Sequence, residues 1–186
     1  MVRKLTLALG VALASPTAVA DPAAYRIESA QSRAEFTIGG ARISGRFAKI
    51  EGRLTYDPGT RAGSIELDLF ASSIDTGWDV RDNLIRSESL FDAARYPRVR
   101  FRSTRFEFDA DRLARVDGDL TLRGVTRHVS FTIPRIQCGR RPDEKPDACT
   151  ALAEGLIRRR EYGMDAWWPL IGDDVQLNIH LMAVRE

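Results

Sequence analysis

The segment from Asp75 to Asp82 gathers carboxylate and guanidinium side chains that could carry acid–base chemistry. Its opening residues, Asp75, Thr76 and Gly77, repeat the tripeptide of aspartic proteases, in which two such carboxylates share a proton. The sequence holds a single copy, and Ser73 stands where retroviral proteases have a bulky apolar residue. We therefore predict a turn in which Asp75 and Thr76 bond the local backbone and Gly77 has a positive φ.

A calcium site in this segment is also disfavoured. The spacing of its carboxylates does not match an EF-hand loop, because Trp78 interrupts the oxygen ligands. Arg81 next to Asp82 is better interpreted as an ion pair or a helix cap than as a catalytic pair. One alternative function remains open: an enzyme or enzyme accessory that acts on an amphiphile, with Asp75, Arg81 and Asp82 as its polar cluster.

The N-terminus has the parts of a secretory signal peptide: a basic head at Arg3 and Lys4, an apolar run, and an Ala-x-Ala site ending at Ala20. The apolar run is shorter than the roughly 20 residues that a membrane-spanning helix needs. We expect residues 1–20 to be removed after Ala20 and residues 21–186 to form one exported domain. Arg3 and Lys4 account for the excess of 28 basic over 26 acidic side chains. The remaining balanced charge gives no footprint for nucleic acid.

Nucleophilic and metal chemistry have few residues to draw on, since the chain has two histidines and two cysteines. His180 alternates with apolar neighbours and should point outward from a strand, and His128 is expected at a strand start. Cys138 and Cys149 flank a polar stretch in a chain bound for an oxidising compartment, which predicts a disulfide that closes this loop. A zinc site would need further ligands nearby. We predict neither a catalytic residue nor a metal site.

Most of the chain alternates apolar and polar residues with period two, which is typical of strands with one buried face. Turn residues such as Gly39 and Gly59 separate the runs. The clearest apolar faces are Ala34, Phe36 and Ile38; Ile65, Leu67 and Leu69; Leu120 and Leu122; Val129, Phe131 and Ile133; and Val175, Leu177, Ile179 and Leu181.

Two of the runs change phase, which indicates an extra residue within a long strand. The apolar face of residues 43–56 switches between Phe47 and Ile50, and that of residues 99–108 switches between Phe101 and Phe106. Such β-bulges bend and twist a sheet. Long, bulged antiparallel strands favour a closed barrel, which removes exposed edges, although a two-layer sandwich stays open at this point.

One segment departs from the strand pattern, because Val80, Leu84 and Phe91 recur at near-helical spacing. Asp79 and Asp82 have the spacing of a capping box at its start. We predict a short helix, inserted between strands, that acts as a lid or plug on one mouth of the barrel. Bulky residues in the connections, Trp78 among them, are expected to line the mouth of an apolar cavity.

These residues also carry a family resemblance, through motifs that occur in the family's order. They are Tyr25-Arg26-Ile27-Glu28, Gly45-Arg46-Phe47, Ser73-Ile74-Asp75-Thr76-Gly77 with Arg81-Asp82, Leu84-Ile85-Arg86-Ser87, Leu90-Phe91-Asp92, Tyr96-Pro97, Phe101-Arg102-Ser103-Thr104, Gly118-Asp119-Leu120-Thr121-Leu122-Arg123-Gly124-Val125-Thr126, Ile157-Arg158-Arg159-Arg160-Glu161-Tyr162-Gly163-Met164 and Asp174-Val175. On these motifs the chain resembles the YceI-like family of polyisoprenoid-binding, lipocalin-like periplasmic proteins.

The resemblance implies an all-β fold: an eight-stranded antiparallel lipocalin-like β-barrel with a short helical insertion. It implies a periplasmic binding protein that holds a long-chain isoprenoid, such as a quinone tail or polyprenyl lipid, for carriage or storage. No catalytic step and no cofactor beyond such a bound lipid follow from it. A homodimer and a membrane cytochrome partner are left open. Gln31 and Gly40 stand where many relatives have histidine, which leaves the head-group contacts undetermined.

The residues expected to bind the ligand are inward strand positions and residues at the mouth of the barrel. They are Phe36, Ile38, Phe47, Leu67, Leu69, Trp78, Arg81, Asp82, Leu84, Phe91, Phe101, Leu120, Phe131, Tyr162 and Met164.

Overall fold

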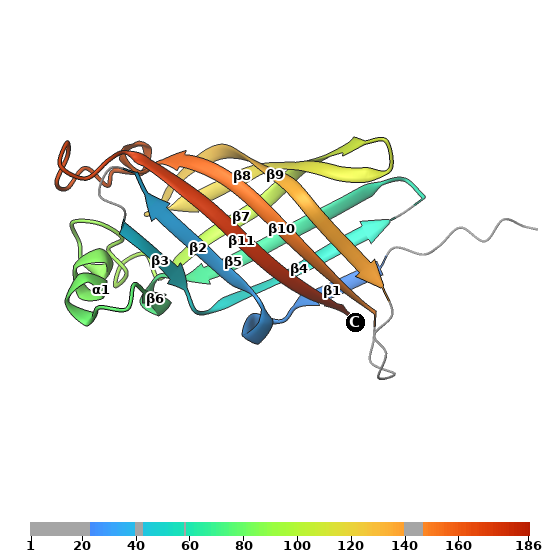
Figure 1. The fold of residues 1–186 in the computed structure, drawn as a ribbon, viewed down its shortest axis with the longest axis horizontal. Coiled ribbons are helices and arrows are strands. Elements are labelled where there is room, and N and C mark those ends of the chain that lie inside the picture. Colours follow the sequence, from blue (N-terminus) through green and yellow to red (C-terminus); the bar gives the residue numbers. More distant parts are fainter. Residues whose placement is uncertain (1–22, 40–42, 58, 140–146) are drawn as a thin grey trace, which may run out of the picture.

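The chain forms a closed antiparallel β-barrel with one short helix at one end (Figure 1). The computed structural model describes residues 23–39, 43–57, 59–139 and 147–186. The expected signal peptide, residues 1–20, and the middle of the cysteine loop, residues 140–146, lie outside this part of the chain. Gly40 also lies outside it.

Within the described ranges the sheet contains eleven strand segments, and each paired segment runs antiparallel to its neighbour. They are β1 (Ala23–Ile27), β2 (Arg33–Ile38), β3 (Ile43–Phe47), β4 (Ile50–Asp57), β5 (Ala62–Phe70), β6 (Ile74–Asp75), β7 (Arg98–Asp109), β8 (Arg112–Leu122), β9 (Val125–Gly139), β10 (Ala148–Arg158) and β11 (Asp174–Arg185). Short 3-10 turns lie at Ser29–Gln31, Ala71–Ser73 and Arg159–Tyr162.

These segments occupy eight positions around the barrel. Both β1 and β2 pair with β11 on one side. On the other side, β1 pairs with β4 and β2 pairs with β3. They are therefore two halves of one strand that is broken at Ser29–Gln31, and β3 with β4, and β5 with β6, are broken in the same way. Pairing of β1 with β11 closes the barrel, which confirms the predicted fold and excludes the two-layer sandwich.

One of the two predicted bulges is confirmed and the other is corrected. The register of β7 against β8 shifts between Ser103 and Arg105, where the apolar face changes phase. Residues 43–56, in contrast, are not one bulged strand, because β3 ends at Phe47 and β4 begins at Ile50. The backbone N–H groups of Ala48 and Lys49, between the two strands, donate hydrogen bonds to the carbonyl oxygen and the hydroxyl of Ser73. Ser73 lies in the break between β5 and β6, so the adjacent strands bend together.

The inserted helix is α1 (Asp79–Arg86), but its buried face differs from the prediction. Val80 and Leu84 are 65% and 43% exposed, whereas Ile85 is 5% exposed and packs into the core. The helix is held by Asp82, whose buried carboxylate accepts hydrogen bonds from the backbone N–H (2.9 Å) and the hydroxyl of Thr76.

The capping box is also corrected. The helix is preceded by Trp78, which makes no side-chain cap, and the Asp82 carboxylate reaches back to Thr76 instead of Asp79. α1 is eight residues long, and across the described ranges no helix has the length and apolar character to cross a membrane.

Candidate ligand cavity

The barrel encloses an apolar cavity of about 810 Å³ at the end opposite α1. Its wall is built from inward positions of β1, β4, β5 and β7 to β11, because alternate residues of each strand point inward. At the mouth it reaches the β7–β8 hairpin, residues 109–112, and the end of β11. The volume lies within the range of about 300–1,000 Å³ that is usual for ligand pockets.

Four aromatic side chains near this mouth are absent from the predicted site: Tyr25, Tyr56, Phe106 and Phe108. Tyr56 stacks on Phe108, with ring centroids 6.4 Å apart. The signal that could have found them is the strand alternation itself, since Tyr56 continues the inward face of β4 and Phe106 and Phe108 continue that of β7.

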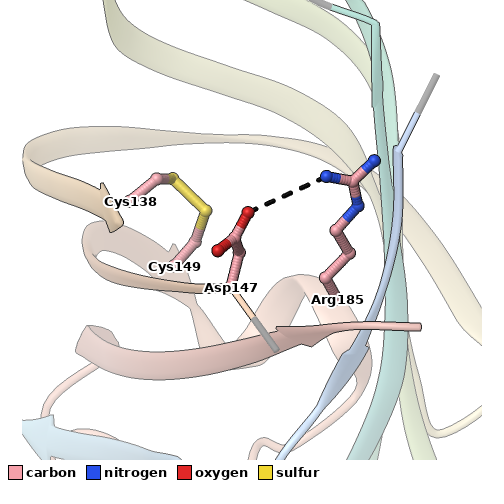
Figure 2. The surroundings of a disulfide bond; sticks show 4 residues. All are labelled: Cys138, Asp147, Cys149 and Arg185. Atoms are coloured by element: carbon pink, nitrogen blue, oxygen red, sulfur yellow. Dashed lines mark ion pairs between the residues drawn. A yellow bond between two sulfur atoms is a disulfide. The ribbon is translucent and has the colours of Figure 1, made fainter. Parts of the chain in front are cut away.

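Charged side chains stand at the mouth, where a polar head group would meet water. Asp109, Asp111, Arg112 and Arg185 line the cavity there. Arg112 lies 3.9 Å from Asp109, and the guanidinium of Arg185 lies 3.8 Å from the carboxylate of Asp147 (Figure 2). The mouth thus offers both donors and acceptors beside an apolar interior.

The predicted disulfide is confirmed, and it forms part of this mouth. Cys138 on β9 and Cys149 on β10 are directly paired in the strand register and joined by a bond of 2.01 Å. Both residues line the cavity, and Figure 2 shows the bond close to the Asp147–Arg185 ion pair. The disulfide therefore ties two wall strands together at the open end.

A second, smaller apolar cavity of about 80 Å³ lies toward the α1 end. Ile85 of α1, followed by Leu90 and Phe91, closes it from the end of the barrel, as expected for a plug. Phe91 packs edge-to-face on Phe47, with centroids 5.8 Å apart. The helical insertion thus seals one end of the barrel, and the larger cavity occupies the other.

The predicted ligand-binding residues fall into three groups. The largest group lines only the smaller cavity: Phe36, Ile38, Phe47, Leu69, Phe91, Leu120 and Met164. Leu67, Phe101 and Phe131 line both cavities. Trp78, Arg81, Asp82, Leu84 and Tyr162 are among the lining residues of neither.

The residues of the third group have other surroundings. Trp78 is 59% exposed and lines neither cavity. Arg81 donates from Nε to the hydroxyl of Thr76 (2.8 Å) and from Nη2 to its carbonyl oxygen (2.7 Å). Tyr162 is fully buried, and its burial raises the pKa of its phenol to about 12. These contacts stabilise the fold around the helical end of the barrel.

The cluster at Asp75 forms a structural turn. Asp75 accepts a hydrogen bond from the N–H of Gly77 (2.9 Å), which has a φ of 76°, and one from Arg46 Nη2 (2.8 Å). These two donors hold the pKa of the Asp75 carboxyl below its usual value. The salt bridge of Asp82 is to Arg86 (3.7 Å) instead of the predicted Arg81. Within the described ranges, no group of three or more His, Cys, Asp or Glu side chains is arranged to hold a metal ion.

Comparison with known proteins finds one family whose model matches most of the chain. Residues 25–183 match the YceI-like domain. The chain is 35% identical over 131 residues to a UPF0312 protein of Pseudomonas putida, covering 67% of this chain and 68% of the relative. It is 29% identical over 150 residues to protein YceI of Escherichia coli, covering 80% and 78%.

Solved structures share the fold. Burkholderia cenocepacia BcnA superposes with a TM-score of 0.70 at 22% identity, covering 85% of this chain and 99% of BcnA. A structure described as a polyisoprenoid binding domain from Saccharophagus degradans, implicated in plant cell wall breakdown, superposes with a TM-score of 0.61 at 18% identity, covering 88% and 99%.

Proposed function

Because the chain belongs to the YceI-like family, we propose that it is a binding protein that holds a long-chain isoprenoid lipid inside its barrel. The observation that carries this proposal is the 810 Å³ apolar cavity, in which the charged residues among the described lining stand at the mouth. The ligand would be a quinone tail or polyprenyl lipid, carried or stored without chemical change. The name of the Saccharophagus degradans domain supports the same ligand class.

The energetics of such a site favour an apolar chain. Each methylene that leaves water contributes about 0.8 kcal/mol, so a chain of many carbons binds tightly with little polar help. The inward residues of β7 and β9, such as Phe101, Phe131 and Ile133, offer surface for this contact and no acid–base group. Asp75, Arg81 and Asp82, the cluster of the enzymatic alternative, are engaged by Arg46, Thr76 and Arg86 outside the cavities.

We also propose that the protein works after export to the periplasm, with residues 1–20 removed. The signal sequence and the disulfide support this location, since disulfides persist in oxidising compartments. Expression of the full chain in a Gram-negative host, followed by N-terminal sequencing of the periplasmic protein, should give a chain that starts at Asp21. Recovery only in the cytoplasm, with Met1 or Val2 at its start, would refute the proposal.

The ligand is tested by native mass spectrometry of the exported protein together with organic extraction. We expect a co-purifying isoprenoid lipid that leaves on extraction and rebinds when added back. Asp75→Asn, which removes a carboxylate outside the cavities, should bind the same lipid to the same extent. A protein that never carries or rebinds an isoprenoid would disprove the proposed function, and turnover of the lipid that Asp75→Asn abolishes would favour the enzymatic alternative.

A further inference from the structure

The two cavities meet at one layer of side chains inside the barrel. Four residues line both: Leu67 on β5, Phe101 on β7, Phe131 on β9 and Ile179 on β11. All four are buried. Since they come from four strands spread around the wall, they form a partition across the interior between the open end and the α1 end.

The two phenylalanines form the bulk of this partition. Phe101 and Phe131 pack edge-to-face, with ring centroids 5.2 Å apart and planes at 84°. Such aromatic pairs prefer this geometry and gain stability from it beyond the burial of their surface. The interior is therefore divided into a large compartment and a small one, although apolar side chains line both.

Glycines on the neighbouring strands hold these two rings in place. A Cβ added at Gly155 on β10 would lie 2.7 Å from the Phe131 ring, and one at Gly118 on β8 would lie 2.5 Å from the Phe101 ring. A real Cβ does not approach other atoms so closely, so a side chain at Gly155 would push the Phe131 ring toward the lumen. At Gly118 a Cβ would also lie 2.4 Å from the carbonyl oxygen of Arg102, so a larger residue there would displace the backbone as well as the Phe101 ring. The glycines thus let both rings lie against the wall.

We propose that Phe101 and Phe131, seated over Gly118 and Gly155, set the length of the apolar chain that the protein accepts. The chain end would rest on the partition, and the head group would lie at the mouth beside Arg112 and Arg185. A carbon atom and a water molecule fill similar volumes, roughly 30 Å³, so the large cavity holds on the order of 25 carbon atoms. This inference rests on the proposed function and adds the ligand's length and orientation to it.

The test measures binding along a series of prenyl alcohols from farnesol through geranylgeraniol to solanesol. Phe131→Leu shortens the partition while keeping it apolar, and Gly155→Ala pushes the Phe131 ring into the lumen. Gly45→Ala is the matched control, because its Cβ would meet Phe36, which lines only the small cavity, and Thr76, which lines neither cavity. Affinities come from competition with a fluorescent fatty acid, and circular dichroism confirms that each variant folds.

In the wild type, affinity should rise with chain length and then level off once the large cavity is full. Phe131→Leu should move that plateau to a longer alcohol, and Gly155→Ala to a shorter one, with a roughly fourfold loss for each excluded methylene. Gly45→Ala should leave it in place. If folded Phe131→Leu and Gly155→Ala both keep the wild-type plateau, the partition does not set the length. A wild type that binds no prenyl alcohol at all would instead contradict the proposed function, and this inference with it.

Discussion

Arg159 places a positive charge in the interior near the sealed end of the barrel. Its guanidinium donates to the carbonyl oxygens of Met164, Ala166 (2.9 Å), Ile171 (2.8 Å) and Gly172 (2.7 Å). Burial lowers the pKa of this guanidinium. Arginine side chains are nevertheless not deprotonated in proteins. The planar guanidinium thus bonds four carbonyl groups of the connection between β10 and β11. Lysine cannot reproduce this arrangement, because its ammonium group is a compact point charge without the planar set of N–H donors.

Arg159→Lys should therefore lower the free energy of unfolding by about 3 kcal/mol, because buried carbonyl groups lose a charged hydrogen-bond donor. Urea unfolding followed by circular dichroism measures this change. Arg160→Lys is the control, since Arg160 forms an exposed ion pair with Asp165 (3.2 Å) that should contribute about 1 kcal/mol at most. Equal losses in the two variants would contradict the role of the Arg159 guanidinium.

The carboxyl group of Asp117 should make the free energy of unfolding fall as the solution becomes acidic. It accepts hydrogen bonds from Ser130 Oγ (2.6 Å) and Arg115 Nε (2.8 Å), and these lower the pKa of its carboxyl below its ordinary value of 3.8. Because the folded state prefers the ionised form, this stabilisation is complete above pH 3.8 and is lost as the pH falls through the lower, folded-state pKa.

Asp117→Asn should remove this contribution. Unfolding in urea between neutral pH and acid should show a smaller loss of stability below pH 3.8 in the variant than in the wild type. Asp119→Asn, at an exposed position of the same strand, controls for the loss of a carboxylate from β8. An acid profile of Asp117→Asn that parallels that of the wild type would show that Asp117 does not contribute.

At the scale of elements, α1 buries one apolar residue and one carboxylate against the barrel. Ile85 lines the small cavity, and Asp82 binds Thr76 just beyond β6. The opposite face presents Val80 and Leu84 to solvent. α1 therefore closes the barrel with the face that carries Ile85. The near-helical spacing of apolar residues had predicted the face that carries Val80 and Leu84.

Ile85→Ala should lower the free energy of unfolding by about 2–4 kcal/mol, because it removes buried methyl groups and leaves a void. Leu84→Ala, one residue earlier and largely exposed, should change it by less than about 1 kcal/mol. Thermal unfolding of both variants measures the difference. The reverse ranking would mean that the helix packs through Leu84 and that the face described above is wrong.

At the scale of the whole molecule, the barrel surrounds a cavity that the described side chains do not fill. Small residues on β10 and β11, such as Ala153 and Ala183, line the large cavity and leave the space open. The lining of an empty apolar space lacks partners for dispersion contacts. A ligand that fills it should stabilise the folded state in proportion to its occupancy.

Ala153→Leu, which extends into the large cavity, should test this on the intact protein. We expect the unliganded variant to be more stable than the wild type by about 1 kcal/mol, because it fills empty space. We also expect it to gain less in Tm when geranylgeraniol is added, because that space is no longer available. Calorimetry with and without the lipid measures both effects. A variant that gains as much as the wild type would place the ligand elsewhere.

Much of the fold was predictable from local periodicity. The alternation through Ala34, Phe36 and Ile38, and through Leu67 and Leu69, identified which face of each strand is buried, because successive side chains of a strand point to opposite sides. The pairing of Cys138 with Cys149 was predictable from the two cysteines, and the helical insertion from its spacing. The buried side of that insertion was not, since Asp82 anchors it through a contact with Thr76.

The position of the large cavity was decided only by the tertiary structure. Alternation selects inward residues but says nothing about which end of a barrel its helix seals, so the predicted site gathered around the small cavity near Phe36, Phe47 and Phe91. The large cavity is the volume left between β1, β4, β5 and β7 to β11, segments that come from both ends of the chain. Its size depends on the positions of the Phe101 and Phe131 rings, which pack against Gly118 and Gly155 on neighbouring strands. The sequence alone thus determined a barrel with an apolar interior, while long-range packing determined where that interior is hollow.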